Sequence, residues 1–480
     1  MVEKEKRGSS GLALKAGIWY VISNFLVKAM AFITTPIFAR LMSEADYGEF
    51  SNYASWQSTL LIITGAELHN TLSRAYYDYT DDYDKYISSV TIASCLLTLV
   101  VYGLFLLCQG WIYSIVAIPP AFVHVMFFTL MCQSCKTIWL ARERTLYRYK
   151  SVAMVSMINL VVPTLIAVAL VILLPVERRL GARIYGTYVP MASIGLVCAI
   201  TMLFRGRSFH LDHVKYAFKL SLPLLVHFLT VTLLTSSNTM VAKSVLGAEV
   251  AALISITTSV IHILTILFQA VSGAVTTWLM DNLDQKNISA ARKGTLLYTA
   301  GVVVVAAGTI LLAPELVWIL GGEKYAAATP LIPGMVLGIV FQSVASVFNI
   351  ILTYDKNVVK TAVYTGVIAV ISIAAKIFLL PVMGYDVLAW INAAAFGALL
   401  VVNYVLARNA GYGKYVNIKA IGLVMLVCVG IVVCSFFLYQ NVLIRYGLIG
   451  LCMVLAVAVL IKYRKLVMNL LKKKFKKKNR

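Results

Sequence analysis

The stretch that decides the fold is residues 15–48, KAGIWYVISNFLVKAMAFITTPIFARLMSEADYG. Its apolar run is long enough to cross the ~30 Å hydrocarbon core of a bilayer, which takes about 20 helical residues. Pro36 loosens the end of this predicted helix, and Arg40 stops its apolar run. Ser43 and Asp46 form an S-x-x-D capping pattern, which predicts that a second helix begins here.

Similar apolar runs fill the rest of the chain. Of its 480 residues, 60% are apolar and 13% are charged, whereas soluble globular chains are about 45–50% apolar and ~25% charged. This composition excludes a soluble domain, and also a nucleic-acid binder, which needs its basic residues on a solvated face. We expect an all-α polytopic membrane protein with about 14 transmembrane helices, over 14–39, 49–74, 86–108, 115–140, 151–175, 182–204, 219–243, 250–278, 294–320, 330–353, 358–381, 384–408, 417–439 and 443–463.

The basic residues are distributed unevenly over the loops between these spans. The chain has 42 Lys and Arg, of which 32 lie on the side of the N-terminus, 7 lie on the opposite side and 3 fall inside spans. Because Lys and Arg collect in cytoplasmic loops, both termini are predicted to be cytoplasmic. The exception is the loop at 176–183, which carries three arginines on the other side. The tail from Lys472 to Arg480 is polybasic and has no acid, which favours contact with anionic membrane lipids.

The predicted spans divide the chain into six parts. These are a cytoplasmic N-terminus (1–13), an N-terminal six-helix bundle (14–204), a cytoplasmic linker (205–218), a C-terminal six-helix bundle (219–408), two additional spans (409–463) and the polybasic cytoplasmic tail (464–480).

Several catalytic motifs are absent. No G-x-x-x-x-G-K-[ST] loop is present to hold nucleotide phosphates, and no H-E-x-x-H pair is present to bind zinc. Asp82 and Asp84 have D-x-D spacing, but they lie in a short Asp/Tyr-rich loop with no room for a nucleotide-binding domain. We therefore expect neither an enzyme nor a bound cofactor or metal.

Ionisable residues inside spans are costly, and they commonly face a cavity or a partner. Lys28 lies near the middle of the first span. Glu67 and Arg74 are seven residues apart in the second predicted span, which would place them on one helical face. Lys28 and Glu67 can meet if the first two spans are neighbours, either as a pair that only holds the helices together or as part of a cavity wall.

The remaining candidates are weaker. Lys376 lies inside the eleventh span, where it lines a cavity or extends its stem toward the outer interface. Arg142 lies at the cytoplasmic end of the fourth span, where it either marks topology or receives an anionic head group. His227 and His262 lie deep in the seventh and eighth spans, as neutral packed histidines or as proton carriers.

The residues around the first loop carry a family resemblance. Pro36, Arg40, a short loop with Ser43 and then Tyr47-Gly48 resemble the polysaccharide exporters, the O-antigen-flippase-like branch of the multidrug, oligosaccharidyl-lipid and polysaccharide (MOP) exporter superfamily. Ala242-Lys243 and its loop echo Ala39-Arg40 about 203 positions later, as in an internal repeat. The chain departs from the family at Asn238, where members often carry an acid.

The resemblance implies two six-helix bundles in a V around a central cavity, with two added C-terminal helices. It also implies that the protein is a flippase for an undecaprenyl-diphosphate-linked oligosaccharide in the bacterial inner membrane. The cavity would contain Lys28, Arg40, Glu67, Arg74, Arg142 and Lys376, and a proton or sodium gradient would couple through Glu67, His227 or His262. A polysaccharide polymerase and chain-length proteins are the expected partners.

Three alternatives stay open at this stage. A peptidoglycan-precursor flippase also fits fourteen spans, whereas a cationic-drug exporter needs acidic residues in its cavity, and Glu67 alone is available. A membrane glycan polymerase needs a long outer loop with catalytic residues, and the predicted outer loops are short.

Overall fold

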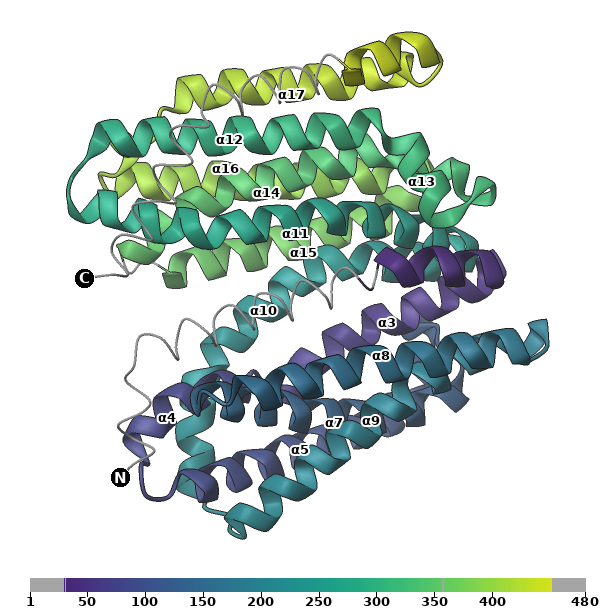
Figure 1. Ribbon diagram of the computed structural model, residues 1–480, viewed down its shortest axis with the longest axis vertical. Helices are drawn as coiled ribbons and strands as arrows, with labels where there is room; N and C mark the ends of the chain where they lie inside the picture. The colour runs from purple at the N-terminus through teal and green to yellow at the C-terminus, as the bar shows by residue number, and fades with distance from the viewer. Residues whose placement is uncertain (1–29, 31, 356–357, 451–480) are drawn as a thin grey trace.

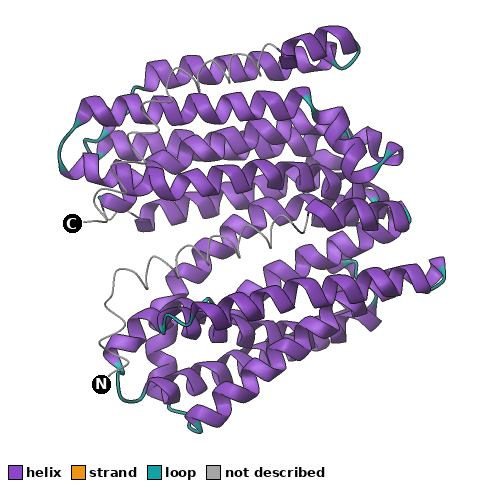
Figure 2. Ribbon diagram, viewed as in Figure 1, coloured by secondary structure: helices purple, strands orange, loops and turns teal. Residues whose placement is uncertain are grey.

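The computed structural model describes residues 30, 32–355 and 358–450. This described part consists of helices and short loops and contains no strand (Figure 2). Its first helix covers Phe32–Leu41. The elements that follow are α3 (Glu44–Gly65), η1 (Leu68–Thr71), α4 (Leu72–Asp78), α5 (Tyr83–Leu107), α6 (Gln109–Val116), α7 (Pro120–Thr145), α8 (Tyr149–Leu173), η2 (Val176–Arg178), α9 (Arg179–Gly206), α10 (Leu211–Leu246), α11 (Ala248–Asp284), α12 (Ile288–Leu311), α13 (Ala313–Gly321), η3 (Glu323–Ala328), α14 (Leu331–Tyr354), α15 (Val358–Met383), α16 (Val387–Asn409), η4 (Gly413–Tyr415) and α17 (Ile418–Leu438).

Figure 1 shows these helices in two groups. The first group contains α3 to α9 and the second contains α11 to α17, while α10 runs diagonally between them. The groups meet at one end, here called the junction end, where the helix over 32–41 and the turn between α10 and α11 lie. They diverge toward the other end, here called the splayed end, which holds α4 and the loop between α11 and α12.

Helix α10 packs against both groups. Near its start, Ala217 is buried in a cluster with Leu68 and Tyr86 of the first group. Further along, Leu234 is buried with Ala369 and Phe396 of the second group. Because one continuous helix is anchored in both groups, a movement of one group relative to the other must bend or shift α10.

The two groups approach each other closely where α3 crosses α11. A Cβ added at Gly48 would lie 1.7 Å from the carbonyl oxygen of Ala248, so only glycine permits this approach. One turn further along, the hydroxyls of Ser51 and Ser255, 204 positions apart, are 2.9 Å from each other. This contact joins α3 of the first group to α11 of the second.

The second predicted span is interrupted, which corrects one expectation. The helix α3 begins after Ser43, whose hydroxyl accepts the Asp46 amide as the capping pattern predicts. It ends at Gly65, because Ala66 and Glu67 adopt positive φ angles of 45° and 54°, which a right-handed helix does not allow. Arg74 lies in the separate helix α4. The prediction that Glu67 and Arg74 share one helical face is therefore wrong.

Eleven helices in the described part of the chain are long and apolar enough to cross a membrane. They correspond to the predicted spans from 86–108 to 417–439, although the run at 294–320 divides into α12 and α13 at Pro314. Helix α3 is as long as a span but more polar. Most of the predicted span 14–39, much of 443–463, Lys28 and the polybasic tail lie outside the described residues.

Candidate functional site

Polar contacts hold the two groups together at the junction end. Lys243 of α10 forms an ion pair with Glu49 of α3. Arg40 donates from Nη2 to the carbonyl oxygen of Trp318 in α13 at 3.1 Å, and Lys324 donates to that of Met42 at 2.7 Å. Arg40 thus donates to a helix of the second group, and Lys324 of the second group donates back to the chain just before α3. We refer to these three contacts as the junction contacts.

Arg183 of α9 lies beside the junction contacts, in an aromatic cage that the sequence did not reveal. Its guanidinium carbon is 4.3 Å, 4.7 Å and 3.6 Å from the ring centroids of Phe38, Tyr47 and Phe50. Such a cation over aromatic faces is attracted by the ring quadrupoles. The available signal was the loop at 176–183, where arginines occur on the side that is otherwise poor in basic residues.

Glu67 lies in the turn between α3 and α4. Its carboxylate accepts a hydrogen bond from the Asn70 amide at 2.7 Å and is 3.8 Å from Nε2 of His69. Glu67 and His69 line a small pocket of about 80 Å³ together with Ser134 and Thr137 of α7. Burial raises the pKa of Glu67, and burial with the nearby Arg144 cation lowers the pKa of His69 to about 4. Both pKa shifts stabilise the neutral form relative to the same side chain in water.

Arg74 and Arg142 lie elsewhere and have partners of their own. Arg74 is exposed and pairs with Asp78 at 3.0 Å. Arg142 is buried and donates to Asp84 at 2.8 Å and to Glu143 at 2.6 Å. Arg40 and Arg74 lie at the junction and splayed ends respectively, so the predicted cations that the structure describes do not form one cluster.

Lys376 and the two histidines lie on the helices of the second group and on α10. Lys376 is fully buried and donates to the carbonyl oxygen of Leu234 and, at 2.8 Å, to the hydroxyl of Ser237, so it does not extend toward the outer interface. His227 is half-buried in α10, and His262 is exposed on α11.

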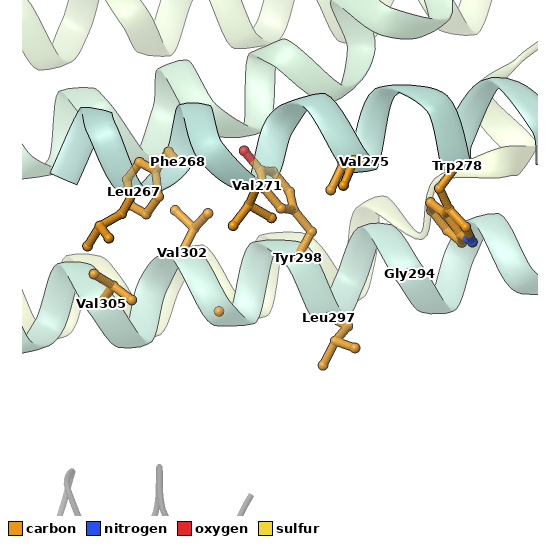
Figure 3. Close-up of a pocket in the computed structure, with 12 residues that line it drawn as sticks. Leu267, Phe268, Val271, Val275, Trp278, Gly294, Leu297, Tyr298, Val302 and Val305 are labelled. Carbon is orange, nitrogen blue, oxygen red and sulfur yellow. The ribbon is translucent and has the colours of Figure 1, made fainter. Parts of the chain in front are cut away.

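An apolar groove of about 650 Å³ runs between α11 and α12. Figure 3 shows side chains of both helices along it, with Trp278 at one end and Leu267 and Val305 toward the other. On the α12 side of the groove, Gly294 and Gly301 have no side chain that would fill it. The other lining residues are Phe268, Val271, Ala274, Val275, Leu297, Tyr298 and Val302.

A polar pocket of about 150 Å³ adjoins the groove, and Phe268 and Tyr298 line both. Its polar side chains carry no charge, because they are amides and hydroxyls. They are Thr265, Gln269 and Ser272 of α11 and Gln342, Ser343 and Ser346 of α14, with the hydroxyl of Tyr298 in hydrogen-bonding contact with Ser343 and Ser346. Sequence reasoning missed this pocket because it followed charges, although glutamine inside an apolar span was the available signal.

Comparisons with known proteins give the fold a context. Residues 13–279 match a family model described as "Polysaccharide biosynthesis protein". The structure is similar to the lipid II flippase MurJ in an inward closed conformation, with a TM-score of 0.69 and 15% identity over 94% of this chain and all of the other.

Two multidrug resistance MATE family transporters of the MOP superfamily are also similar. The inward-facing structure has a TM-score of 0.53 and 13% identity, covering 80% of this chain and 94% of the other. The outward-facing structure has a TM-score of 0.53 and 12% identity, covering 84% of this chain and 98% of the other. No curated protein matches the sequence. The predicted all-helical transporter fold is thus confirmed.

Proposed function

Since this chain belongs to the polysaccharide biosynthesis protein family and has the all-helical fold of MOP superfamily transporters, we propose that it is a flippase for a lipid-linked oligosaccharide. The substrate is an oligosaccharide repeat unit on undecaprenyl diphosphate. The flippase moves this molecule from the cytoplasmic to the outer leaflet of the bacterial cell membrane, and the sugar then enters a surface polysaccharide.

The observation that carries the proposal is the apolar groove that adjoins a neutral polar pocket. A long isoprenoid chain needs apolar lining such as that of α11 and α12, because burying it there avoids contact with water. Sugar hydroxyls both donate and accept hydrogen bonds, and so do the amides of Gln269 and Gln342 and the hydroxyls of Ser343 and Ser346. An amphipathic lipid sugar matches both parts at once.

We place the splayed end in the cytoplasm and the junction end outside. The splayed end carries the loops on the side of the N-terminus, where 32 of the 42 Lys and Arg lie. In this orientation the junction contacts close the path to the outside. Alternating access requires that these contacts break while contacts at the cytoplasmic end form.

The diphosphate and the driving ion are assigned from residue chemistry. A buried diphosphate needs cations, and we propose Lys28 for this role, because Arg74 and Arg142 already pair with carboxylates. Coupling to protons or sodium would use Glu67, His227 or His262, as the sequence suggested. A polysaccharide polymerase and chain-length proteins remain the proposed partners after translocation.

Deleting the gene tests the substrate. We expect loss of surface polysaccharide and accumulation of undecaprenyl-diphosphate oligosaccharides on the cytoplasmic side. Accumulation of peptidoglycan precursor would instead favour the lipid II alternative, and sensitivity to cationic drugs with normal polysaccharide would favour an exporter. The likeness to MurJ concerns the fold and does not decide between them.

A further inference from the structure

Lys376 is a buried amine without an acidic partner among the described residues. Its side chain has no exposed surface, and its Nζ donates to the Leu234 carbonyl oxygen at 3.3 Å and to the Ser237 hydroxyl at 2.8 Å. Both acceptors are neutral, and Lys376 forms no ion pair with any described residue. A charge buried in this way is costly, because neutral acceptors do not repay the lost hydration.

The surroundings offer further oxygen atoms but no counter-charge. Ser372, one turn before Lys376 on α15, and Asn238, which follows Ser237 on α10, each have a buried side-chain oxygen without a hydrogen-bond partner. A charged amine has three N–H groups, of which the structure satisfies two, and neither of these oxygen atoms carries a charge that would stabilise it.

The titratable groups on the helices packed against Lys376 do not form ion pairs with it. Lys243 of α10 is engaged by Glu49. The others are Asp212, His213, Lys215, Tyr216, Lys219 and His227 on α10, Lys360 and Tyr364 on α15, Tyr354 on α14, and Tyr404 and Arg408 on α16. The state of the amine is therefore set mainly by burial and by its two neutral acceptors.

The partner helix of Lys376 is the one that joins the two groups. α10 is anchored in the first group through Ala217 and in the second through Leu234, whose carbonyl oxygen accepts the Lys376 bond (Figure 1). A change in this bond acts on the helix that must shift when the groups move.

We propose that Lys376 is a proton switch that fastens α10 to α15. In the packed arrangement seen here the amine is neutral. When α10 moves and water reaches the site, the amine binds one proton from that water and becomes an ammonium. When the helices pack again, the N–H bond breaks and the proton leaves to water. No other co-reactant is needed.

The role of this switch in transport, where one proton would be exchanged in each cycle, rests on the proposed function. The conformational switch itself needs no substrate, so the test below can fail or succeed independently of the lipid-linked sugar.

Distances between spin labels at the splayed end test the switch. Cysteines replace Asp81, between α4 and α5, and Gln285, between α11 and α12, in full-length protein without native cysteines, in nanodiscs and without substrate. When the pH is lowered from 9 to 6, we expect the fraction of molecules in the packed arrangement, recognised by the distance between the two labels that dominates at pH 9, to fall at least threefold. Lys376→Met has no amine and should stay in the packed, high-pH arrangement at both pH values. Lys376→Arg stays charged and should show the distance distribution of the low-pH wild type at both pH values.

Two further variants keep the test decisive. Lys136→Met is the matched control, because Lys136 is also a lysine within a span and bonds to Asn159 at 3.1 Å inside the first group; it should respond to pH like the wild type. If Lys376→Met does not fold, Ser237→Asp places a carboxylate beside the amine, where it pairs with the ammonium across α10 and α15 and should hold the packed, high-pH population at both pH values. A wild type without pH response, or a pH response that survives in Lys376→Met or Ser237→Asp, would overturn the switch.

Discussion

At the scale of single residues, partners decide what each charged side chain does. Arg142 illustrates this, because its burial and its bonds to Asp84 and Glu143 make it a tie between α5 and α7. Residue type and position identified it as a candidate, but its carboxylate partner lies 58 positions away in the chain. Such pairing follows from tertiary packing and is not visible in one sequence.

His69 gives a prediction at this scale. Its pKa is lowered to about 4 by burial and by the Arg144 cation, so the folded state binds a proton less readily than the unfolded state, whose histidine titrates near 6.5. Stability is therefore complete above about pH 6.5 and is lost as the pH falls toward 4. At pH 5 the loss is about 2 kcal/mol.

The thermal unfolding midpoint in nanodiscs measures this loss. Lowering the pH from 7.5 to 5 should lower the unfolding midpoint of the wild type more than that of His69→Gln, because the glutamine side chain does not titrate in this range. Equal decreases in both proteins would show that His69 does not contribute to the pH dependence of stability.

At the scale of elements, the helices were predictable and their interruptions were not. An apolar run is a property of consecutive residues, so the spans from 86–108 to 417–439 were found from sequence. The end of α3 depends on positive φ angles at Ala66 and Glu67, which are not glycines, so local composition gave no warning. The junction contacts and the neutral pocket depend on which helices become neighbours.

The Glu49–Lys243 ion pair between α3 and α10 gives a prediction about the junction. Glu49→Gln or Lys243→Met should shift spin-label distances across the junction end toward separation. The double variant should shift them no further than either single variant, because the same contact is lost. Exchanging the residues, Glu49→Lys with Lys243→Glu, should restore the wild-type distances. Additive shifts would indicate that the two charges act separately.

The groove between α11 and α12 can be filled by one substitution. A side chain at Gly301 would meet no atom within 4 Å of its Cβ, so Gly301→Leu projects into the groove without a clash. We expect flipping to fall at least tenfold. Gly430→Leu, on exposed and equally open α17 surface outside the groove, should retain wild-type flipping. Similar rates in both variants would exclude the groove as the site of the lipid chain.

At the scale of the whole molecule, two groups of helices are closed at one end and diverge at the other (Figure 1). The fold class and the family followed from the apolar runs and from the pattern around Pro36 and Arg40. The composition of the site did not follow, because the sequence pointed to charges while the groove and pocket of the second group are apolar and neutral. The proposed substrate, a lipid-linked sugar, would account for these features together with the closed junction end.

Translocation by the purified protein tests this central claim most directly. Proteoliposomes are loaded with a fluorescent undecaprenyl-diphosphate oligosaccharide, and an added sugar-cleaving enzyme reports the fraction in the outer leaflet over time. We predict that the protein speeds exchange between leaflets at least tenfold over liposomes without protein, with no such acceleration for peptidoglycan precursor. Exchange of the oligosaccharide at the protein-free rate, with active folded protein confirmed by its unfolding midpoint, would contradict the proposal.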